Sequence, residues 1–596
     1  MTEIDFHIVK KIRQNVRECA EQGAMQYSSE HVWHELSWAQ MGAQIDSVSF
    51  ALISAGIQVQ DKVGIMASNT PRWTIIDLAA MQVRGVVVPI YPTSPVSQAA
   101  YITNNADIKI MFVNGQEQLN MMVELFSNLP ILERIVVMGD DLELPDVDYV
   151  QTWQAFIEMG QSLTQAALDE RLDSLQREDL FTLIYTSGTT GEPKGVMLNH
   201  HNLNAQLVGH DQKVNTSSGD VSLCFLPLSH VFERAWSLYV LYKGAKNCYL
   251  HDVRAVRDAL EQVAPNVMCA VPRFYEKIYS AIHDKVSQSS WIKRHLFRWA
   301  VRVGKQVSSA KQQQRNPSAW LALNYALADR LVLKKLRNLL GGRMRLMPCG
   351  GAKLEAEVGR FFHAIGINVK LGYGMTETTA TISCWPDNTF DAESIGDVMP
   401  NVDVKIGADN EILVKGSIVM QGYYKLPDAT KQAFDEQGYF KTGDVGHLGD
   451  DGTLFITDRL KELMKTSGGK YIAPQRIEGK LGQDHFIEQV AVIADTRKFV
   501  SALIVPCYDS LENYAKSLNI RYHDRLDLLK HHKIIELFDQ RLEQLQTELA
   551  GFERVKRFTL LPKEFSLDLG ELTPTLKLRR KVIQHHYATE INAMYH

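Results

Sequence analysis

The sequence YTSGTTGEPKG at residues 185–195 is the stretch that decides the fold of this chain. Apolar runs at 180–184 and 196–198 flank it, so we expect a loop between two strands. Its three glycines allow the backbone to approach a ligand closely, and its N–H groups and hydroxyls can surround phosphate oxygens. The loop predicts a phosphate site made by Thr186, Ser187, Gly188, Thr189, Thr190, Gly191 and the cationic Lys194.

This loop differs from a Walker A motif, in which four residues separate a first glycine from Gly-Lys-Ser or Gly-Lys-Thr. Here Lys194 precedes Gly195, and the chain has no match to the Walker A pattern. The phosphate site is therefore of another kind.

Strands and helices alternate through the sequence around this loop. Short β-rich runs at 62–66, 86–89 and 108–113 are separated by helical patterns at 73–83 and 96–104. Such alternation is typical of a parallel sheet with helices on both faces. The same pattern predicts further strands at 246–250, 267–271, 344–348 and 368–372.

The chain has 596 residues, more than one core holds, because single cores stop growing at roughly 250–300 residues. We expect an α/β protein whose large N-terminal domain, residues 1–457, contains stacked α/β subdomains. Short strands separated by Gly and Asp turns predict a small β-rich subdomain at about 403–457. Residues 458–596 predict a smaller α+β C-terminal domain.

Composition excludes several classes of protein. A net charge of −5 gives no reason to expect nucleic-acid binding. The seven cysteines are scattered without a C-x-x-C pair, which argues against a disulfide framework or zinc site and fits a reducing cytosol. Residues 1–17 mix charged and apolar side chains, and no stretch approaches the roughly 18–20 apolar residues of a membrane span. We therefore expect a cytoplasmic enzyme.

One segment, residues 285–315, contains eight Lys or Arg and no Asp or Glu. Its apolar side chains recur at spacings of three and four, with arginines on the opposite face, which predicts a basic amphipathic helix. The expected apolar face consists of Ile292, Leu296, Trp299, Val303 and Val307. The helix either packs on the large domain as an ordinary surface helix or attaches peripherally to an anionic membrane surface.

The loop at 185–195 resembles the phosphate loop of the acyl-adenylate-forming, or AMP-binding, enzymes. That superfamily includes acyl-CoA synthetases, peptide-synthetase adenylation domains and beetle luciferases. Further family motifs follow in order: GYGMTET at 372–378, YFKTGD at 439–444, DR at 458–459, KTSGGKYI at 465–472 and LTPTLKLR at 572–579. The resemblance covers roughly residues 30–590 and is nearest to bacterial long-chain fatty-acyl-CoA synthetases.

The resemblance implies roles for the residues that would bind ATP and AMP. Tyr373, followed by Gly374, would stack on adenine, and Thr376 would contact the phosphate. Asp444 would bind the ribose hydroxyls, because a carboxylate can accept two hydrogen bonds from a diol, and Arg459 would also reach the ribose. Small residues that permit close approach, Gly350, Gly351 and Ala352, would line the adenine pocket.

The resemblance also implies the groups that handle charge. Glu377 and Thr186 would hold Mg²⁺, which favours few hard oxygen ligands beside phosphate oxygens. Lys577 would bridge the substrate carboxylate and the α-phosphate, although Leu576 stands where most family members have glycine. His230, in LPLSHVFER at 226–234, would lie beside the acyl carboxylate as a positioning residue.

A second step and a hinge are implied as well. The loop containing Gly468, Gly469 and Lys470 would approach the thiol of coenzyme A in that step, with Asp458 as the hinge of a mobile C-terminal lid. Because Lys577 and this loop belong to the same domain, the domain would rotate between the two half-reactions.

The sequence therefore predicts a long-chain fatty acid–CoA ligase. ATP and a fatty acid would give acyl-AMP and pyrophosphate, and coenzyme A would then give acyl-CoA and AMP. The alternatives are an acyl-AMP ligase that loads a separate carrier protein, a CoA ligase for medium-chain or aryl acids, and a non-enzymatic membrane-binding member. A fused carrier domain is not expected, because only 19 residues follow Lys577. Acyl chain length and oligomeric state, a homodimer included, stay open.

Overall fold

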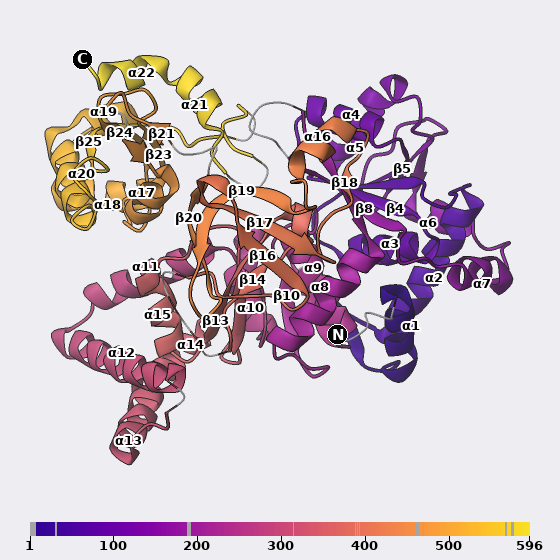
Figure 1. The fold of residues 1–596 in the computed structure, drawn as a ribbon, viewed down its shortest axis with the longest axis horizontal. Coiled ribbons are helices and arrows are strands. Elements are labelled where there is room, and N and C mark those ends of the chain that lie inside the picture. The colour runs from indigo at the N-terminus through magenta and orange to yellow at the C-terminus, as the bar shows by residue number, and fades with distance from the viewer. Residues whose placement is uncertain are drawn as a thin grey trace.

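The computed structural model describes residues 7–29, 32–186, 192–313, 315–387, 389, 391, 394–459, 464–468, 470–566, 569–573 and 577–596, with backbone only for 458, 459 and 471. Figure 1 shows a large body and, at the upper left, a smaller C-terminal part.

An eight-stranded sheet has the order β18-β9-β8-β4-β3-β5-β6-β7. Its strands from β8 to β7 are parallel, and β9 and β18 add antiparallel to one edge. The strands are β3 (Lys62–Met66), β4 (Val86–Ile90), β5 (Ile108–Val113), β6 (Arg134–Val137), β7 (Val150–Thr152), β8 (Leu180–Thr186), β9 (Lys194–Asn199) and β18 (Gly422–Tyr423).

Helices cover both faces of this sheet, as the sequence predicted. Consecutive residues of β5, such as Ile110 and Met111, belong to two different apolar clusters, because successive side chains of a strand point to opposite faces of the sheet. One cluster includes α2 (Trp38–Ser54) and α3 (Pro71–Gln82), and the other includes α4 (Val96–Asn105) and α5 (Gln116–Leu125). Around this sheet lie α1 (Ile8–Glu18), α6 (Trp153–Glu158), α7 (Gln165–Asp173) and α16 (Pro427–Ala433).

Two further four-stranded sheets have the orders β10-β11-β1-β2 and β12-β13-β14-β15. Isolated parallel bridges of Val267 to Ser222 and Leu346, and of Ala270 to Cys349, link them where the sequence predicted a strand at 267–271. Their strands are β1 (Gly23–Ser29), β2 (Val32–Ser37), β10 (Val221–Cys224), β11 (Lys246–Tyr249), β12 (Leu346–Cys349), β13 (Asn368–Tyr373), β14 (Ser383–Cys384) and β15 (Asp397–Val398).

Helices α8 (His200–Lys213) and α9 (Val231–Tyr242) supply side chains to the cluster that also holds β3 and β5. A separate cluster is made with α11 (Pro272–Ser287), α12 (Trp291–Gln312), α13 (Ala319–Ala328) and α15 (Ala356–Ala364). The short helices α10 (Val256–Val263) and α14 (Lys334–Asn338) complete this region. These layers form the stacked α/β architecture that the alternation indicated.

An antiparallel sheet of order β16-β17-β19-β20 makes the β-rich part. Its strands are β16 (Val402–Ile406), β17 (Glu411–Gly416), β19 (Phe440–Leu448) and β20 (Leu454–Arg459). The residue predicted as the hinge, Asp458, lies in β20 opposite Val445. Its role as a hinge stays a prediction.

The residues from 464 onward have apolar clusters of their own. Arg273 of α11 reaches across to them, donating to the carbonyls of Gly482 at 2.9 Å and Glu488 at 3.0 Å. The elements here are β21 (Met464–Lys465), β22 (Tyr471–Ile472), α17 (Pro474–Leu481), β23 (Ile487–Ile493), β24 (Val500–Pro506), α18 (Tyr508–Ser517), α19 (Arg525–Lys530), α20 (His532–Leu545), β25 (Val555–Leu560), α21 (Arg580–His586) and α22 (Ala588–Ala593).

Within the predicted basic helix at 285–315, the chain breaks between α11 and α12, and the buried face differs from the expected one. Gly304 packs against α15, where a Cβ atom would stand 2.1 Å from the Ala364 carbonyl oxygen. This close approach sets which side of α12 faces inward: Phe297, Ala300, Val303, Gly304 and Val307 are buried. Ile292, expected on the apolar face, is 59% exposed. In the described residues, no helix has both the length and the apolarity needed to cross a bilayer.

Candidate active site

The predicted adenine-binding segments lie at the carboxyl ends of two neighbouring parallel strands. Strand β12 ends at Cys349, opposite Leu371 of β13, so Gly350–Ala352 and Tyr373-Gly374 emerge at the same edge. Ligands of α/β sheets bind at this edge. Both turns need glycine: Gly351 has a φ of +90°, and a Cβ on Gly374 would stand 1.6 Å from the Ala380 carbonyl oxygen.

Tyr373 and Asp444 meet directly. The Tyr373 hydroxyl donates to Oδ2 of Asp444 at 2.7 Å, although the residues are 71 positions apart. Asp444 is 2% exposed, and its backbone N–H donates to Oγ1 of Thr442 at 3.0 Å. The backbone of Arg459 lies opposite Asp444 in the β19–β20 pairing. The structure thus brings the predicted adenine and ribose residues together.

Glu377, the predicted magnesium ligand, and Lys194 of the predicted phosphate loop both contact Tyr423, a residue that the motifs did not indicate. The Tyr423 hydroxyl donates to Oε1 of Glu377 at 3.0 Å, and Nζ of Lys194 lies 5.0 Å from the centroid of the Tyr423 ring. Burial and the Glu377 carboxylate raise the pKa of Tyr423, so its hydroxyl stays a donor. Thr186 pairs with Lys194 across β8 and β9.

Residues 417–424 hold this arrangement together. Asn202 of α8 donates to the carbonyls of Ser417 at 2.8 Å and Val419 at 2.9 Å. The N–H of Met420 donates to the carbonyl of Glu377 at 2.8 Å, and that of Tyr424 to the carbonyl of Gly195 at 2.8 Å. The segment therefore connects the turn containing Thr376 and Glu377 with the strand that begins at Lys194. Ser187, Gly188, Thr189, Thr190 and Gly191 lie outside the described residues.

His230 caps the start of α9. Its Nδ1 accepts a hydrogen bond from the N–H of Phe232 at 3.1 Å. Burial, followed by the charge of Lys577, lowers the pKa of His230 to about 4. The ring is therefore neutral at pH 7, and since Nδ1 accepts, the proton resides on Nε2. His230 is therefore a neutral N–H donor within reach of the charge of Lys577, a lysine of the C-terminal part.

The glycine loop after the predicted hinge lies elsewhere. Lys470 donates its backbone N–H to Oγ1 of Thr466 at 3.1 Å, and its Nζ lies 5.7 Å from the ring centroid of Phe552. Gly468 is exposed, and Gly469 lies outside the described residues. Of the two predicted functional segments of the C-terminal part, Lys577 is close enough for its charge to lower the pKa of His230, whereas Lys470 lies beside Phe552.

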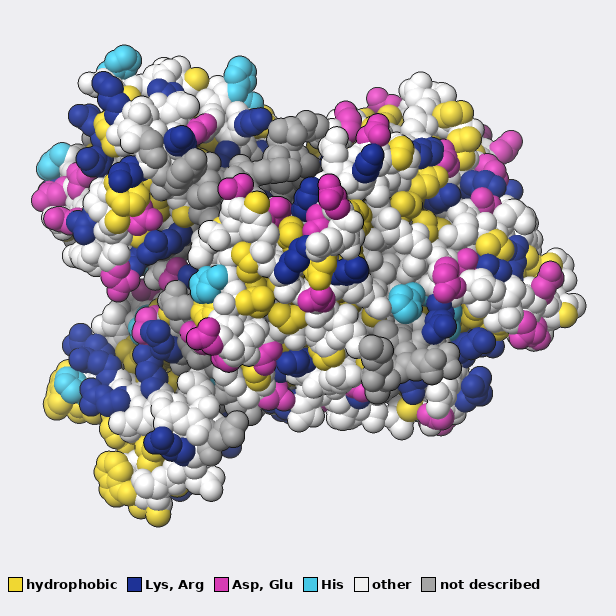
Figure 2. Space-filling model, in the orientation of Figure 1, with side chains coloured by type: hydrophobic (Ala, Val, Ile, Leu, Met, Phe, Trp, Pro, Cys, Tyr) yellow, Lys and Arg dark blue, Asp and Glu magenta, His cyan; other side chains and the backbone are white. Residues whose placement is uncertain are grey.

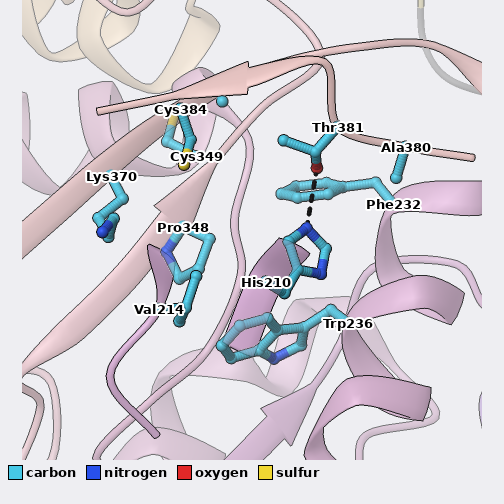
Figure 3. A pocket seen from close by; sticks show the side chains of 11 residues that line it. His210, Val214, Phe232, Trp236, Pro348, Cys349, Lys370, Ala380, Thr381 and Cys384 are labelled. Atoms are coloured by element: carbon cyan, nitrogen blue, oxygen red, sulfur yellow. Dashed lines mark hydrogen bonds between the residues drawn. The ribbon is translucent and has the colours of Figure 1, made fainter. Parts of the chain in front are cut away.

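A cavity of about 40 Å³ lies between α8, α9 and the β12–β14 strands. Figure 3 shows that aromatic and aliphatic side chains surround it, among them Phe232, Trp236 and Val214. His210 and Thr381 close one side through a 3.1 Å hydrogen bond between Nε2 and Oγ1. The cavity holds little more than one or two water molecules, so a long acyl chain requires it to widen.

Two buried groups that the sequence did not indicate support α9. Burial raises the pKa of Glu233 to about 8, and the carboxyl accepts from the N–H of Leu226 at 3.1 Å. Arg234 forms an ion pair with Asp77 and donates to Oγ1 of Thr182 at 2.6 Å. Both groups fix the helix start that carries His230.

Comparison with known proteins identifies the arrangement. Residues 12–424 match the AMP-binding enzyme family, and residues 461–596 match the AMP-binding enzyme C-terminal domain. The chain belongs to the AMP-binding enzyme family. The expected family is therefore confirmed, the protein is an enzyme, and membership of this family supports the use of ATP.

AMP-binding enzymes of several kingdoms resemble the chain over nearly its whole length. A long-chain-fatty-acid–CoA ligase of Mycobacterium tuberculosis is 33% identical over 569 residues, covering 95% of this chain and 93% of that protein. Long-chain-fatty-acid–CoA ligase 1 of Homo sapiens is 32% identical, covering 94% and 82%.

Solved structures of other proteins share the fold. The adenylation domain of a carboxylate reductase from Mycobacterium chelonae has a TM-score of 0.79 at 21% identity, covering 100% of this chain and 92% of that one. An anthranilate CoA ligase bound to anthranoyl-AMP has a TM-score of 0.73 at 18% identity, covering 99% and 98%. The expected α/β fold class, with a large N-terminal and a smaller C-terminal part, is confirmed.

Proposed function

We propose that this protein is a long-chain fatty acid–CoA ligase. It converts ATP and a fatty acid to acyl-AMP and pyrophosphate, and then transfers the acyl group to the thiol of coenzyme A with release of AMP. The substrate class rests on the relatives of that name at 32–33% identity. The adenylation step is supported above all by one arrangement, in which the Tyr423 hydroxyl bonds the carboxylate of Glu377 while the Tyr423 ring lies 5.0 Å from Nζ of Lys194.

The first step needs no general base, because a carboxylic acid with a pKa near 4–5 is already ionised at pH 7. A carboxylate oxygen attacks the α-phosphorus of ATP, and the bond to pyrophosphate breaks. The obstacle is repulsion between two anions, so catalysis depends on positioning and charge neutralisation. Lys577 and Lys194 supply positive charge, and Nε2–H of His230 donates to the carboxylate oxygen that does not attack.

A magnesium ion fits the residues around Glu377. Mg²⁺ in such sites is held by one or two carboxylates together with substrate phosphates. Glu377 offers one carboxylate oriented by Tyr423, and the described residues contain no group of three or more His, Cys, Asp or Glu that would form a closed cage. Glu377 and Thr186 would hold the ion. When bound, it neutralises charge on the phosphate oxygens and on the departing pyrophosphate.

The nucleotide would lie along the Tyr373–Asp444 edge. Adenine stacks on Tyr373 and fits against Gly350, Gly351 and Ala352, and Thr376 contacts the α-phosphate. Asp444 accepts hydrogen bonds from the ribose hydroxyls, with Arg459 nearby. A carboxylate has about four acceptor positions, so the bond from Tyr373 leaves capacity for a diol and orients the group.

The acyl chain would enter the cavity beside Phe232 and Trp236. That cavity has about 40 Å³, so a long chain is accommodated only when the surrounding helices and side chains move apart. His210 is neutral there, because burial and the charge of Lys370 lower its pKa to about 4. The neutral His210 ring is compatible with an apolar chain, and the charged Lys370 of the lining is paired with Asp387 at 2.8 Å.

For the second step, the C-terminal domain would rotate about Asp458. Lys577 would leave His230, and Gly468, Gly469 and Lys470 would approach the thiol of coenzyme A. This division of labour is supported by the different surroundings of the two lysines: the charge of Lys577 acts on the pKa of His230, and Lys470 lies beside Phe552. A domain boundary at Asp458 is part of the proposal.

We also propose a cytoplasmic location, with peripheral contact at the inner face of a membrane through residues 285–315. The seven cysteines are all free thiols, and five are buried, which is usual for a reducing compartment.

The test is ATP–pyrophosphate exchange with acids from C2 to C18, followed by addition of coenzyme A. Exchange that is strongest with long-chain acids, and a thioester that appears only after coenzyme A is added, would support the proposal. Exchange without thioester would replace coenzyme A by a carrier protein as the acceptor. Exchange limited to short or aryl acids would overturn the proposed substrate class. If no acid supported exchange, the proposal that this enzyme forms acyl-adenylates would be wrong.

A further inference from the structure

A helical protrusion leaves the large body at the α12 and α13 helices, at the lower left of Figure 1. Figure 2 shows hydrophobic side chains at its outer edge, beside a group of Lys and Arg side chains. The proposed acyl-CoA chemistry uses none of these residues.

Helix α13 is apolar on both sides. Its inner side packs Leu321, Tyr325 and Ala328 on the protein core. Its outer side presents Trp320 and Leu323, which are 72% and 71% exposed, and Leu327 continues the same stripe at helical spacing. A helix that is hydrophobic all round normally lies in a protein core or in lipid, so we expect the exposed outer stripe to contact an apolar surface.

The beginning of α12 adds a second apolar group. Trp291 is 65% exposed and Ile292 is 59% exposed. Large apolar residues exposed in this way on one protrusion differ from the single scattered ones that are normal on protein surfaces.

The charged residues within this stretch of chain have one sign. From Lys285 through the end of α13, the chain contains eight Lys or Arg and no Asp or Glu. Lys305 forms an ion pair with Glu357 at 2.9 Å. Within the part of the chain that the structure describes, the other cations of α12 have no ion pair; they are Lys293, Arg294, Arg298, Arg302 and Lys311.

We propose that the outer face of α13 and the start of α12 dock on an anionic phospholipid bilayer. The stripe of Trp320, Leu323 and Leu327 inserts at the level between headgroups and acyl chains, where tryptophan is favoured. The unpaired cations of α12 bind the anionic headgroups. Helix α13 has only 10 residues, so it lies in the interface and does not span the membrane.

The charge favours lipid over a second copy of this chain. Two copies meeting through the same face would bring the cations of one α12 toward those of the other, and like charges brought together oppose association. An anionic bilayer neutralises the same cations. If the enzyme acts on fatty acids as proposed, docking also brings it to the phase in which they dissolve.

The test is flotation of the full chain with vesicles of phosphatidylcholine alone or with 30% phosphatidylglycerol. The wild type should bind the anionic vesicles. The variant Trp320→Ala/Leu323→Ser/Leu327→Ser should lose about tenfold or more in partitioning, because it loses most of the inserted apolar surface. The variant Arg294→Gln/Arg298→Gln/Arg302→Gln should lose the preference for phosphatidylglycerol. The matched control, Val253→Ala/Leu526→Ala, removes exposed apolar groups elsewhere and should bind like the wild type.

Equal binding of the wild type and the α13 variant, or no binding by the wild type, would overturn the proposal. So would a wild-type dimer, detected by sedimentation without lipid, that the α13 variant abolishes. ATP–pyrophosphate exchange with octanoate in the absence of vesicles should be the same in all variants. It separates a failure of docking from a failure of the proposed enzymatic function.

Discussion

The hydroxyl of Tyr423 donates a 3.0 Å hydrogen bond to Oε1 of Glu377, and its ring lies below the ammonium group of Lys194. One side chain from the edge strand β18 therefore orients the proposed metal ligand and contacts the phosphate-loop lysine. The following variants test this relationship and the others that define the site.

Tyr423→Phe keeps the ring beneath Lys194 and removes only the hydrogen bond to Glu377. A hydrogen bond to a charged group contributes about 1.5–3 kcal/mol, so adenylation should slow by roughly 10–100-fold. The Mg²⁺ concentration for half-maximal rate should also rise, which a purely structural role would not cause. Tyr424→Phe, which loses a bond to Asp107 instead, is the matched control. An unchanged Mg²⁺ dependence would contradict the orienting role.

Lys577→Ala should slow acyl-adenylate formation by about 10²–10³-fold, because it removes a charge that acts on the α-phosphate of the adenylyl group being transferred. Thioester formation from supplied acyl-AMP and coenzyme A should stay near the wild-type rate. Both half-reactions are followed in single turnovers, with the exposed Lys581→Ala as control. Equal loss in both steps would refute the division of labour between Lys577 and the loop at 468–470.

Asp444→Asn should raise the KM for ATP by roughly 10–100-fold, because hydrogen bonds to a charged acceptor are stronger than those to an amide. Tyr373→Phe, which keeps the ring for stacking, should have a smaller effect on KM. The control is Asp403→Asn, since Asp403 also accepts a bond from a tyrosine, Tyr439, but on the surface. A KM for ATP that Asp444→Asn leaves unchanged would remove this residue from the ribose site.

Arg234→Met should destabilise the large domain by about 3–5 kcal/mol, because it leaves the carboxylate of Asp77 buried without its partner. The two side chains are 3% and 1% exposed. Urea unfolding followed by tryptophan fluorescence measures the shift in midpoint. Arg254→Met removes an exposed pair with Asp252 and should leave the midpoint unchanged. A similar midpoint for both variants would show that the buried pair is not needed for stability.

His210 should make stability depend on pH. Burial lowers its pKa from 6.5 to about 4, so between these values the unfolded chain binds a proton that the folded protein does not. The contribution of His210 to the free energy of unfolding is therefore at its full value above pH 6.5, and it decreases as the pH falls toward 4. From pH 7 to pH 5 the loss is about 2 kcal/mol. His210→Gln should reduce the fall in urea midpoint over that range, and an identical fall would contradict the buried neutral state.

Much of the fold was predictable because the signals are local. The runs at 62–66 and 108–113 became β3 and β5 with those bounds, since alternation of strands and helices depends on residues close in sequence. The run at 267–271 was predicted as a strand but forms isolated bridges between two sheets. Pairing depends on neighbours that the run itself does not specify.

The sequence by itself determined the family, the order of its motifs and the chemical types at the site. The glycines predicted to approach phosphate, the carboxylate predicted to bind a diol and the lysine predicted to bind an anion can be recognised from single residues and short spacings. Only the tertiary structure decided that Tyr423 serves Glu377, that Tyr373 meets Asp444 across 71 positions, and which face of α12 is buried. Those relationships join segments far apart in the chain, so they exist only once the sheets and helices have packed.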